Sequence, residues 1–67
     1  MNIVLNGQPR ELPPDTRTVA ELIAHLELGE VRVAVAVNRQ VVSRNDHDAC
    51  QLEDGDRVEV IHAVAGG

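Results

Sequence analysis

The stretch that decides the fold is residues 57–67, which read Arg57-Val58-Glu59-Val60-Ile61-His62-Ala63-Val64-Ala65-Gly66-Gly67. Valines alternate with charged residues over its first half, which is the period of a strand with one buried face. The stretch then passes through small residues to two glycines, where the sequence stops. We therefore expect a final strand followed by a thin, flexible tail that ends in a carboxylate.

The length and composition limit what the rest of the chain can be. Its 67 residues suffice for one small domain. Because it has no Phe, Tyr or Trp, its core must be built from Val, Leu and Ile. A core this small leaves no room for an enclosed pocket of enzyme size. We therefore expect a protein that is not itself an enzyme, with no catalytic residues and no bound cofactor.

The charge balance excludes further classes. Eleven acidic residues face six basic ones, all arginine, for a formal net charge of −5. This argues against nucleic acid and anionic membranes as partners, and favours a protein with a basic docking site. The sequence shows no signal peptide and no membrane-spanning stretch. Its single cysteine, Cys50, allows no internal disulfide. We expect a soluble, cytoplasmic protein.

The first half of the chain predicts a hairpin and a helix. Residues 2–6 and 8–12 read as strands around Asn6-Gly7, a pair typical of a type I′ turn, and Pro9 places the second strand at a sheet edge. Thr18 and Glu21 have the spacing of a capping box. The helix that follows has an apolar stripe and a glycine stop at Gly29. The stripe consists of Val19, Leu22, Ile23 and Leu26.

The second half predicts three more strands. Valines alternate with Arg32 and two alanines over residues 31–37, and Asn38-Arg39 turns the chain into a short strand at 40–43. Residues 44–51 read as a loop with room for one helical turn. Leu52 is an apolar anchor before the Asp54-Gly55 turn, and the last strand begins at Arg57.

This order of elements predicts an α+β fold of the β-grasp type. A mixed sheet of four to five strands, with the two terminal strands parallel at its centre, would carry one main helix on one face. Residues 1–64 would form the domain and 65–67 the tail. The helix would cover Ile3, Leu5, Val33, Val35, Val58 and Val60. The opposite face would expose Ala34, Ala36, Ile61 and Ala63, a low-relief apolar surface that we interpret as a docking face.

The chain resembles the ubiquitin-like sulfur carriers, and most closely the ThiS family of thiamine thiazole biosynthesis. The resemblance runs through residues 3–7 (Ile-Val-Leu-Asn-Gly), 33–38 (Val-Ala-Val-Ala-Val-Asn), 41–42 (Val-Val) and 54–67. The last segment is the specific one, because it joins Asp-Gly-Asp, a strand and a final Gly-Gly at fixed spacing. Two residues depart from the family pattern: Arg39-Gln40 stand where Gly-Glu is frequent, and His47 where Trp is common.

The resemblance implies the chemistry. An E1-like adenylating enzyme (ThiF-like) would use ATP to activate the Gly67 carboxylate, and a cysteine desulfurase or sulfur relay would supply the sulfur. The resulting Gly67 thiocarboxylate would pass its sulfur to thiazole synthase (ThiG-like). Ala65 and Gly66 would thread the tail into the partners, since residues without large side chains enter narrow sites most easily.

Other interpretations remain open at this point. A molybdopterin synthase small subunit would share the fold and tail, and a β-grasp interaction module would have inert glycines. Cys50, three residues after His47, is more typical of a buried small hydrophobe than of a nucleophile, because Asp46 and Asp48 nearby disfavour a thiolate. The three histidines and Cys50 lack metal-ligand spacing, so we expect no metal site.

Overall fold

A computed structural model describes residues 1–27 and 33–62 of the chain. Its elements are β1 (Asn2–Leu5), β2 (Gln8–Glu11), α1 (Val19–His25), β3 (Val33–Val37), β4 (Gln40–Val42), a 3₁₀ turn η1 (Arg44–Asp46) and β5 (Arg57–His62). The five strands form one sheet in the order β2-β1-β5-β3-β4. Only β1 and β5 run parallel, while the other neighbours are antiparallel.

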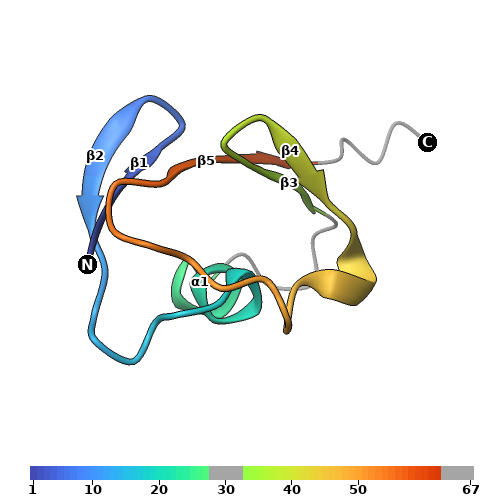
Figure 1. The fold of residues 1–67 in the computed structure, drawn as a ribbon, viewed down its shortest axis with the longest axis horizontal. Helices are drawn as coiled ribbons and strands as arrows, with labels where there is room; N and C mark the ends of the chain where they lie inside the picture. Colours follow the sequence, from blue (N-terminus) through green and yellow to red (C-terminus); the bar gives the residue numbers. More distant parts are fainter. Residues whose placement is uncertain (28–32, 63–67) are drawn as a thin grey trace.

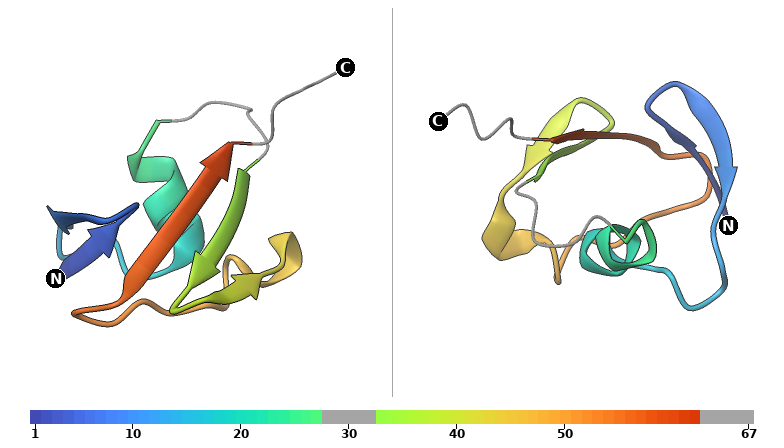
Figure 2. Two further views of the ribbon diagram at one scale, coloured as in Figure 1. Left: turned by 90° about the horizontal axis from the view of Figure 1, so that it is seen from above. Right: turned by 180° about the vertical axis from the view of Figure 1, so that it is seen from behind.

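This arrangement confirms the expected α+β fold with its mixed sheet and single main helix. The helix α1 lies across one face of the sheet, and β5 runs along the middle between β1 and β3 (Figures 1 and 2). Pro9 lies in β2, at the edge of the sheet, where its missing N–H leaves no ladder bond unmade.

The core lies between the sheet and α1 and is entirely aliphatic. Its buried members are Ile3, Leu12, Val19, Leu22, Val35, Leu52, Val58 and Val60. Each contributes about 1.5–3 kcal/mol through burial. Leu5 and Val33, also expected there, are half-buried against this cluster. Leu12 lies just beyond β2 and still packs into the core, so the residue after the edge strand anchors the chain below the sheet.

The start of α1 is capped as its sequence predicts. Thr18 accepts a hydrogen bond from the Glu21 backbone N–H (3.1 Å), and the Glu21 carboxylate accepts one from the Thr18 N–H (3.1 Å). The two N–H groups between Thr18 and Glu21 also lack partners within the helix, and they donate to a loop that is distant in the sequence. Val19 donates to the Cys50 carbonyl and Ala20 to the His47 carbonyl, each at 3.0 Å. The loop after η1 is therefore bound to the helix end, which needs those acceptors.

The end of α1 differs from the expectation. The helix stops at His25, with Leu26 as its C-cap, and Glu27 adopts a left-handed backbone with φ 54°. The expected stop at Gly29 lies outside the described residues. The last of the four stripe residues, Leu26, is half-buried and packs on the core although it lies past the helix.

Two type I′ turns, one on each side of β5, form hydrogen bonds with this strand. Asn6 and Gly7 have φ 49° and 81°, and Asn38 and Arg39 have φ 50° and 71°. The Asn6 side chain accepts from the Val60 N–H (2.9 Å) and donates to the Val60 carbonyl (3.2 Å), so it continues the β1–β5 ladder past the end of β1. These side-chain bonds explain why asparagine suits the first turn position.

The second turn, at Asn38-Arg39, is hydrogen-bonded to the beginning of β5. The Asn38 side-chain oxygen accepts from the Arg57 N–H (3.0 Å), and the Asn38 backbone N–H donates to the Arg57 carbonyl (2.7 Å). The Asn38 side-chain N–H also donates to the Asp56 carboxylate (3.1 Å). The two asparagine amides thus replace ladder partners that the neighbouring strands are too short to supply.

The Asp-Gly-Asp turn before β5 is part of the same network. The Asp54 carboxylate accepts from the Asn2 N–H (2.7 Å), and the Asp56 carboxylate accepts from the Glu53 N–H (2.8 Å). Gly55 has φ 90°, a conformation that a side chain would strain. The Asp54 carboxylate therefore joins this turn to the start of β1, and the Asp56 carboxylate joins it to the β3–β4 turn through Asn38.

We predict that the capping box makes the fold sensitive to acid. The N–H of Arg17, then the hydroxyl and N–H of Thr18, bond to the Glu21 carboxylate and hold its pKa below the ordinary value of 4.5. Because the unfolded chain then protonates first, this stabilisation is complete above about pH 4.5 and is lost as the pH falls through the folded pKa. Urea midpoints, followed by far-ultraviolet circular dichroism, should therefore fall less on acidification in Glu21→Gln than in the wild type.

The control for this experiment is Glu11→Gln on the exposed edge strand β2, which should retain the wild-type acid dependence. Equal acid dependence in Glu21→Gln and the wild type would contradict the role assigned to the capping box.

A second prediction separates the amide contacts from the turn geometry. Asn6→Gly keeps a residue that adopts positive φ freely but removes both bonds to Val60, so it should lower the free energy of unfolding by about 1–2 kcal/mol. Arg39→Gly relieves a left-handed backbone at a side chain that is exposed, and should raise the free energy by about 0.5–1 kcal/mol. Urea unfolding of both variants measures their free energies of unfolding. Relative to the wild type, that of Asn6→Gly must be lower and that of Arg39→Gly higher; changes of the same sign would contradict the prediction.

Candidate docking face and the exit of the last strand

The strand β5 carries the chain toward its C-terminal residues. Its last residue, His62, pairs with Val33 at the start of β3, so the strand leaves the sheet from a central position. The four site residues predicted beyond this point lie outside the described residues. They are Ala63, Ala65, Gly66 and Gly67.

The sheet face opposite α1 brings together the other predicted docking residues. Ala34 pairs with Ile61, and Ala36 with Glu59, while Val35 between the two alanines is buried toward the helix. The Ile61 side chain is 60% exposed and lies beside Ala34, so the two form one apolar area on this face, and contiguous apolar area of this kind is what marks a docking surface. We call this side of the sheet the open face.

The structure adds two apolar residues to the open face. Val41 pairs with Ala36 across β3 and β4 and is 81% exposed, and Val4 pairs with Arg57 and is half-buried. Neither residue was among those predicted for the docking face from the sequence. The alternation in residues 2–6 places Val4 opposite the buried Ile3, but the face of Val41 follows only from the pairing of β4 with β3.

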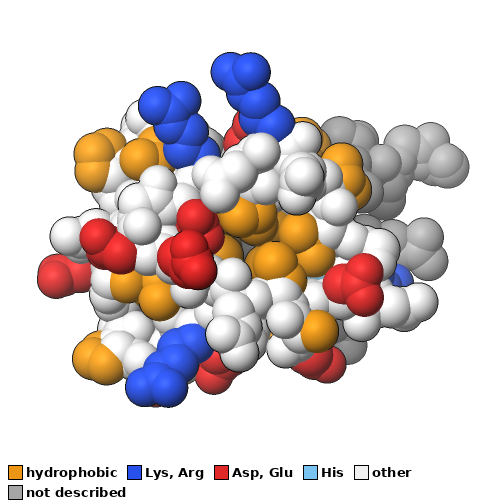
Figure 3. Space-filling model, in the orientation of Figure 1, with side chains coloured by type: hydrophobic (Ala, Val, Ile, Leu, Met, Phe, Trp, Pro, Cys, Tyr) orange, Lys and Arg blue, Asp and Glu red, His pale blue; other side chains and the backbone are white. Residues whose placement is uncertain are grey.

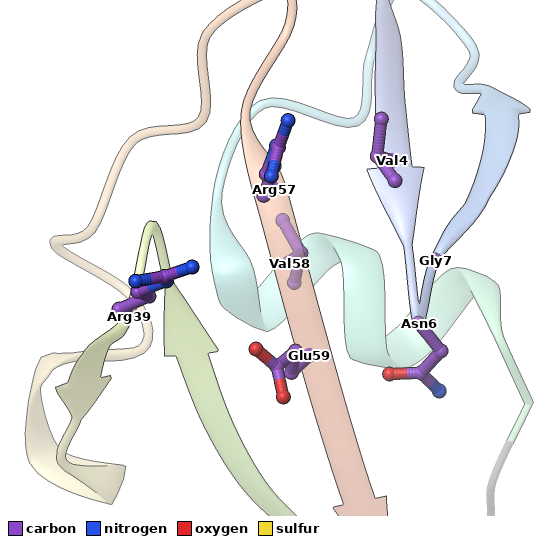
Figure 4. A pocket seen from close by; sticks show the side chains of 7 residues that line it. All are labelled: Val4, Asn6, Gly7, Arg39, Arg57, Val58 and Glu59. Carbon is purple, nitrogen blue, oxygen red and sulfur yellow. The ribbon is translucent and has the colours of Figure 1, made fainter.

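Charged residues gather at the end of the open face near the two type I′ turns. A hollow there is lined by residues of β1, β5 and both turns (Figure 4), namely Val4, Asn6, Gly7, Arg39, Arg57, Val58 and Glu59. The side chains of Arg39, Arg57 and Glu59 extend over this hollow in the close view. The open face therefore has an apolar part beside the exit of β5 and a charged part at the start of β5.

Cys50 has a structural position. It is a free, half-buried cysteine that packs against the core, and its carbonyl caps α1 through Val19. Both features fit the interpretation of Cys50 as a small buried hydrophobe. Among residues 1–27 and 33–62, no group of three or more His, Cys, Asp and Glu is placed so that it could hold a metal ion. Within the same ranges, no helix has the length and apolar character that a membrane crossing requires.

The comparisons with known proteins point to one family. The model of the ThiS family matches residues 3–67. The chain is 32% identical to the sulfur carrier protein ThiS of Bacillus subtilis (94% of this chain, 96% of that protein) and 31% identical to that of Escherichia coli (100% of both). The crystal structure of the thiamine biosynthesis protein ThiS from Geobacter metallireducens superposes with a TM-score of 0.84 at 33% identity, covering 100% of both chains.

A longer relative contains a similar region. The chain is 39% identical over its full length to part of a thiazole synthase from Magnetococcus marinus, and it spans a fifth of that protein. A protein named as a thiazole synthase thus contains a region similar in sequence to this whole chain. The family match over nearly the whole chain and the structural agreement at 33% identity lead to one conclusion: this chain belongs to the ThiS family.

Proposed function

We propose that this protein is a sulfur carrier in thiamine biosynthesis that works as a thiocarboxylate on Gly67. The observation that carries the proposal is the family match through residues 3–67, which includes the terminal Gly66-Gly67 pair. The fold supports it, because β5, the strand that precedes these residues, lies at the centre of the sheet and is hydrogen-bonded to a strand on each side.

The proposed reaction activates a carboxylate that is otherwise a poor electrophile. The Gly67 carboxylate attacks the α-phosphate of ATP on an activating enzyme and releases pyrophosphate, which gives an acyl-adenylate. A persulfide sulfur then attacks the acyl carbon, and AMP leaves with the oxygen. A thiol reduces the resulting acyl disulfide, so that the thiocarboxylate and a new disulfide remain. The carrier supplies the acyl group, and its partners supply the catalytic groups.

The position of β5 helps its tail to reach such sites. Hydrogen bonds to β1 and β3, together with the amides of Asn6 and Asn38, fix the direction of the strand up to the edge of the described residues. A partner that binds the rigid open face therefore also aligns the exit of β5. A strand exit that is already aligned lowers the entropic cost of bringing the carboxylate to the reacting phosphate.

The partners follow from this chemistry. We propose a ThiF-like adenylating enzyme that uses ATP, a cysteine desulfurase or relay that delivers the sulfur, and a thiazole synthase as acceptor. The thiazole synthase that contains a similar region supports the last of these. The alternative of a molybdopterin synthase small subunit shares the activation steps and differs in the acceptor. The alternative of an interaction module does not use the carboxylate.

The carrier chemistry predicts a change in intact mass. Incubation with ATP, the adenylating enzyme, a desulfurase, cysteine and a thiol should replace one oxygen by sulfur on the full chain. Deletion of Gly67 should abolish the change, while circular dichroism and the urea midpoint should stay at wild-type values because the deletion removes no residue of the described core or sheet. Mass spectrometry of the intact protein measures the conversion.

An unchanged mass of the wild-type chain, with a known carrier converted in a parallel reaction, would contradict the carrier function and favour the interaction module. Supply of the converted protein to a thiazole synthase and to a molybdopterin synthase large subunit then separates the two carrier alternatives.

The open face makes a separate prediction about partner binding. Ile61→Asp places a charge in the middle of the apolar part and should raise the KM of the adenylating enzyme for the carrier about tenfold or more, with stability little changed because Ile61 is 60% exposed. Asn45→Asp in η1, also exposed, adds the same charge away from this face and should keep the wild-type KM. Equal KM values for both variants would show that the partner binds elsewhere.

A further inference from the structure

The charged part of the open face is unusual for this chain. The protein has eleven acidic residues and a formal net charge of −5, yet the hollow beside β5 contains two arginines and one glutamate. Basic side chains (blue) project from the top of the space-filling view, on the side of the sheet away from α1 (Figure 3). The hollow is thus a locally positive site on an acidic molecule.

The two arginines are fixed relative to each other. Arg39 belongs to the β3–β4 turn, and the residue before it, Asn38, makes two hydrogen bonds with the backbone of Arg57 (2.7 and 3.0 Å). The turn that carries one guanidinium is therefore bonded to the residue that carries the other. Their backbones form a rigid pair, so a ligand that uses both side chains need not order the backbone first.

Arg39 also occupies a costly position. Its φ of 71° lies in the left-handed region, where a side chain is disfavoured by about 1 kcal/mol relative to glycine. The side chain is exposed and lines the hollow, so no burial in the core offsets this cost. Strained residues of this kind are found preferentially where the side chain serves binding.

We propose that this site, the arginine hollow of Arg39 and Arg57, receives an acidic side chain of the adenylating enzyme that binds the open face. The inference rests on the proposed function, since it assigns the chemistry of that partner. Guanidinium groups pair with carboxylates through two parallel hydrogen bonds, which fixes orientation as well as charge. The apolar part beside the exit of β5 supplies burial, and the arginine hollow sets the register of the partner along the strand.

Glu59 gives the site an internal competitor. It lies on β5 two residues after Arg57, on the same side of the sheet, and lines the same hollow. An incoming carboxylate must approach this negative charge, so the glutamate opposes the ligand that the arginines attract. Removal of the Glu59 charge should strengthen partner binding, which is the opposite of the effect expected for the arginines.

The test measures steady-state adenylation with the full-length carrier and the adenylating enzyme. Arg39→Gln and Arg57→Gln should each raise the KM for the carrier about three- to fivefold with kcat unchanged, because a docking contact at the start of β5 acts on binding and does not alter the chemical step. Glu59→Gln should lower the KM. High salt should reduce the differences, since charge pairs at a surface are screened.

Matched controls separate local from overall charge. Arg44→Gln, at the exposed 3₁₀ turn, changes the net charge from −5 to −6 as the two test variants do, and should keep the wild-type KM. Glu53→Gln plays the same part for Glu59→Gln. If Arg44→Gln raises the KM as much as the test variants, net charge governs binding and the arginine hollow is excluded as a docking site.

The outcomes also distinguish this inference from the proposed function. Conversion of the wild type to the thiocarboxylate, together with unchanged KM values in Arg39→Gln and Arg57→Gln, overturns the inference and leaves the carrier function standing. Failure of the wild type to be adenylated overturns both. A KM raised by Arg57→Gln and restored in part by Arg57→Lys supports the carboxylate, because lysine keeps the charge but loses the paired donors.

Discussion

The hydrogen-bonded setting of β5 is the constraint on which the rest of the structure depends. This strand lies between a parallel neighbour, β1, and an antiparallel neighbour, β3, and it contributes Val58 and Val60 to the core. The flanking strands are shorter than the distance that β5 spans, and the amides of Asn6 and Asn38 supply the missing partners. Loss of these contacts would leave polar backbone groups of the central strand without these partners, and the groups of Val60 are partly buried, so their loss costs more than that of an exposed hydrogen bond.

Because α1 covers one face of the sheet, the described elements leave the opposite face exposed to solvent. In a chain of 67 residues without aromatic side chains, the aliphatic side chains on the helix side are only enough for a single core layer. The residues that alternate with the core valines must therefore point away from it. They are small or charged along most of β3 and β5, so the face stays compatible with water, and Ile61 and Val41 make it suited to a partner.

The turns show a balance between stability and binding. Asparagine and glycine tolerate the left-handed backbone of the first type I′ turn, and Asn6 adds bonds to β5. The second turn repeats this pattern with Asn38 but places an arginine where glycine would be relaxed. The backbone cost at Arg39 is small beside the stability of a whole domain, yet it is avoidable, which distinguishes it from the positive φ of the two asparagines.

The sequence by itself determined every element whose signal is local. Three such signals depend only on neighbouring residues and can therefore be predicted from the sequence. They are the strand period around Val58, the capping spacing of Thr18 and Glu21, and the Asn6-Gly7 pair. The order of these elements was enough to predict the β-grasp sheet with its parallel central pair, because a crossover containing a helix joins parallel strands. The chemistry of the tail came from the resemblance and stays a proposal, since residues 63–67 lie outside the described part.

Tertiary structure decided the features that join distant residues. The end of α1 moved from the expected Gly29 to His25, with the loop carbonyls of His47 and Cys50 fixing the other end of the helix. The contacts of Asn6 and Asn38 with β5 span 54 and 19 residues. The contact of Asn38 also brings Arg39 and Arg57 to the same hollow. Such contacts leave no periodicity in the sequence, because their geometry exists only after the sheet has closed around its central strand.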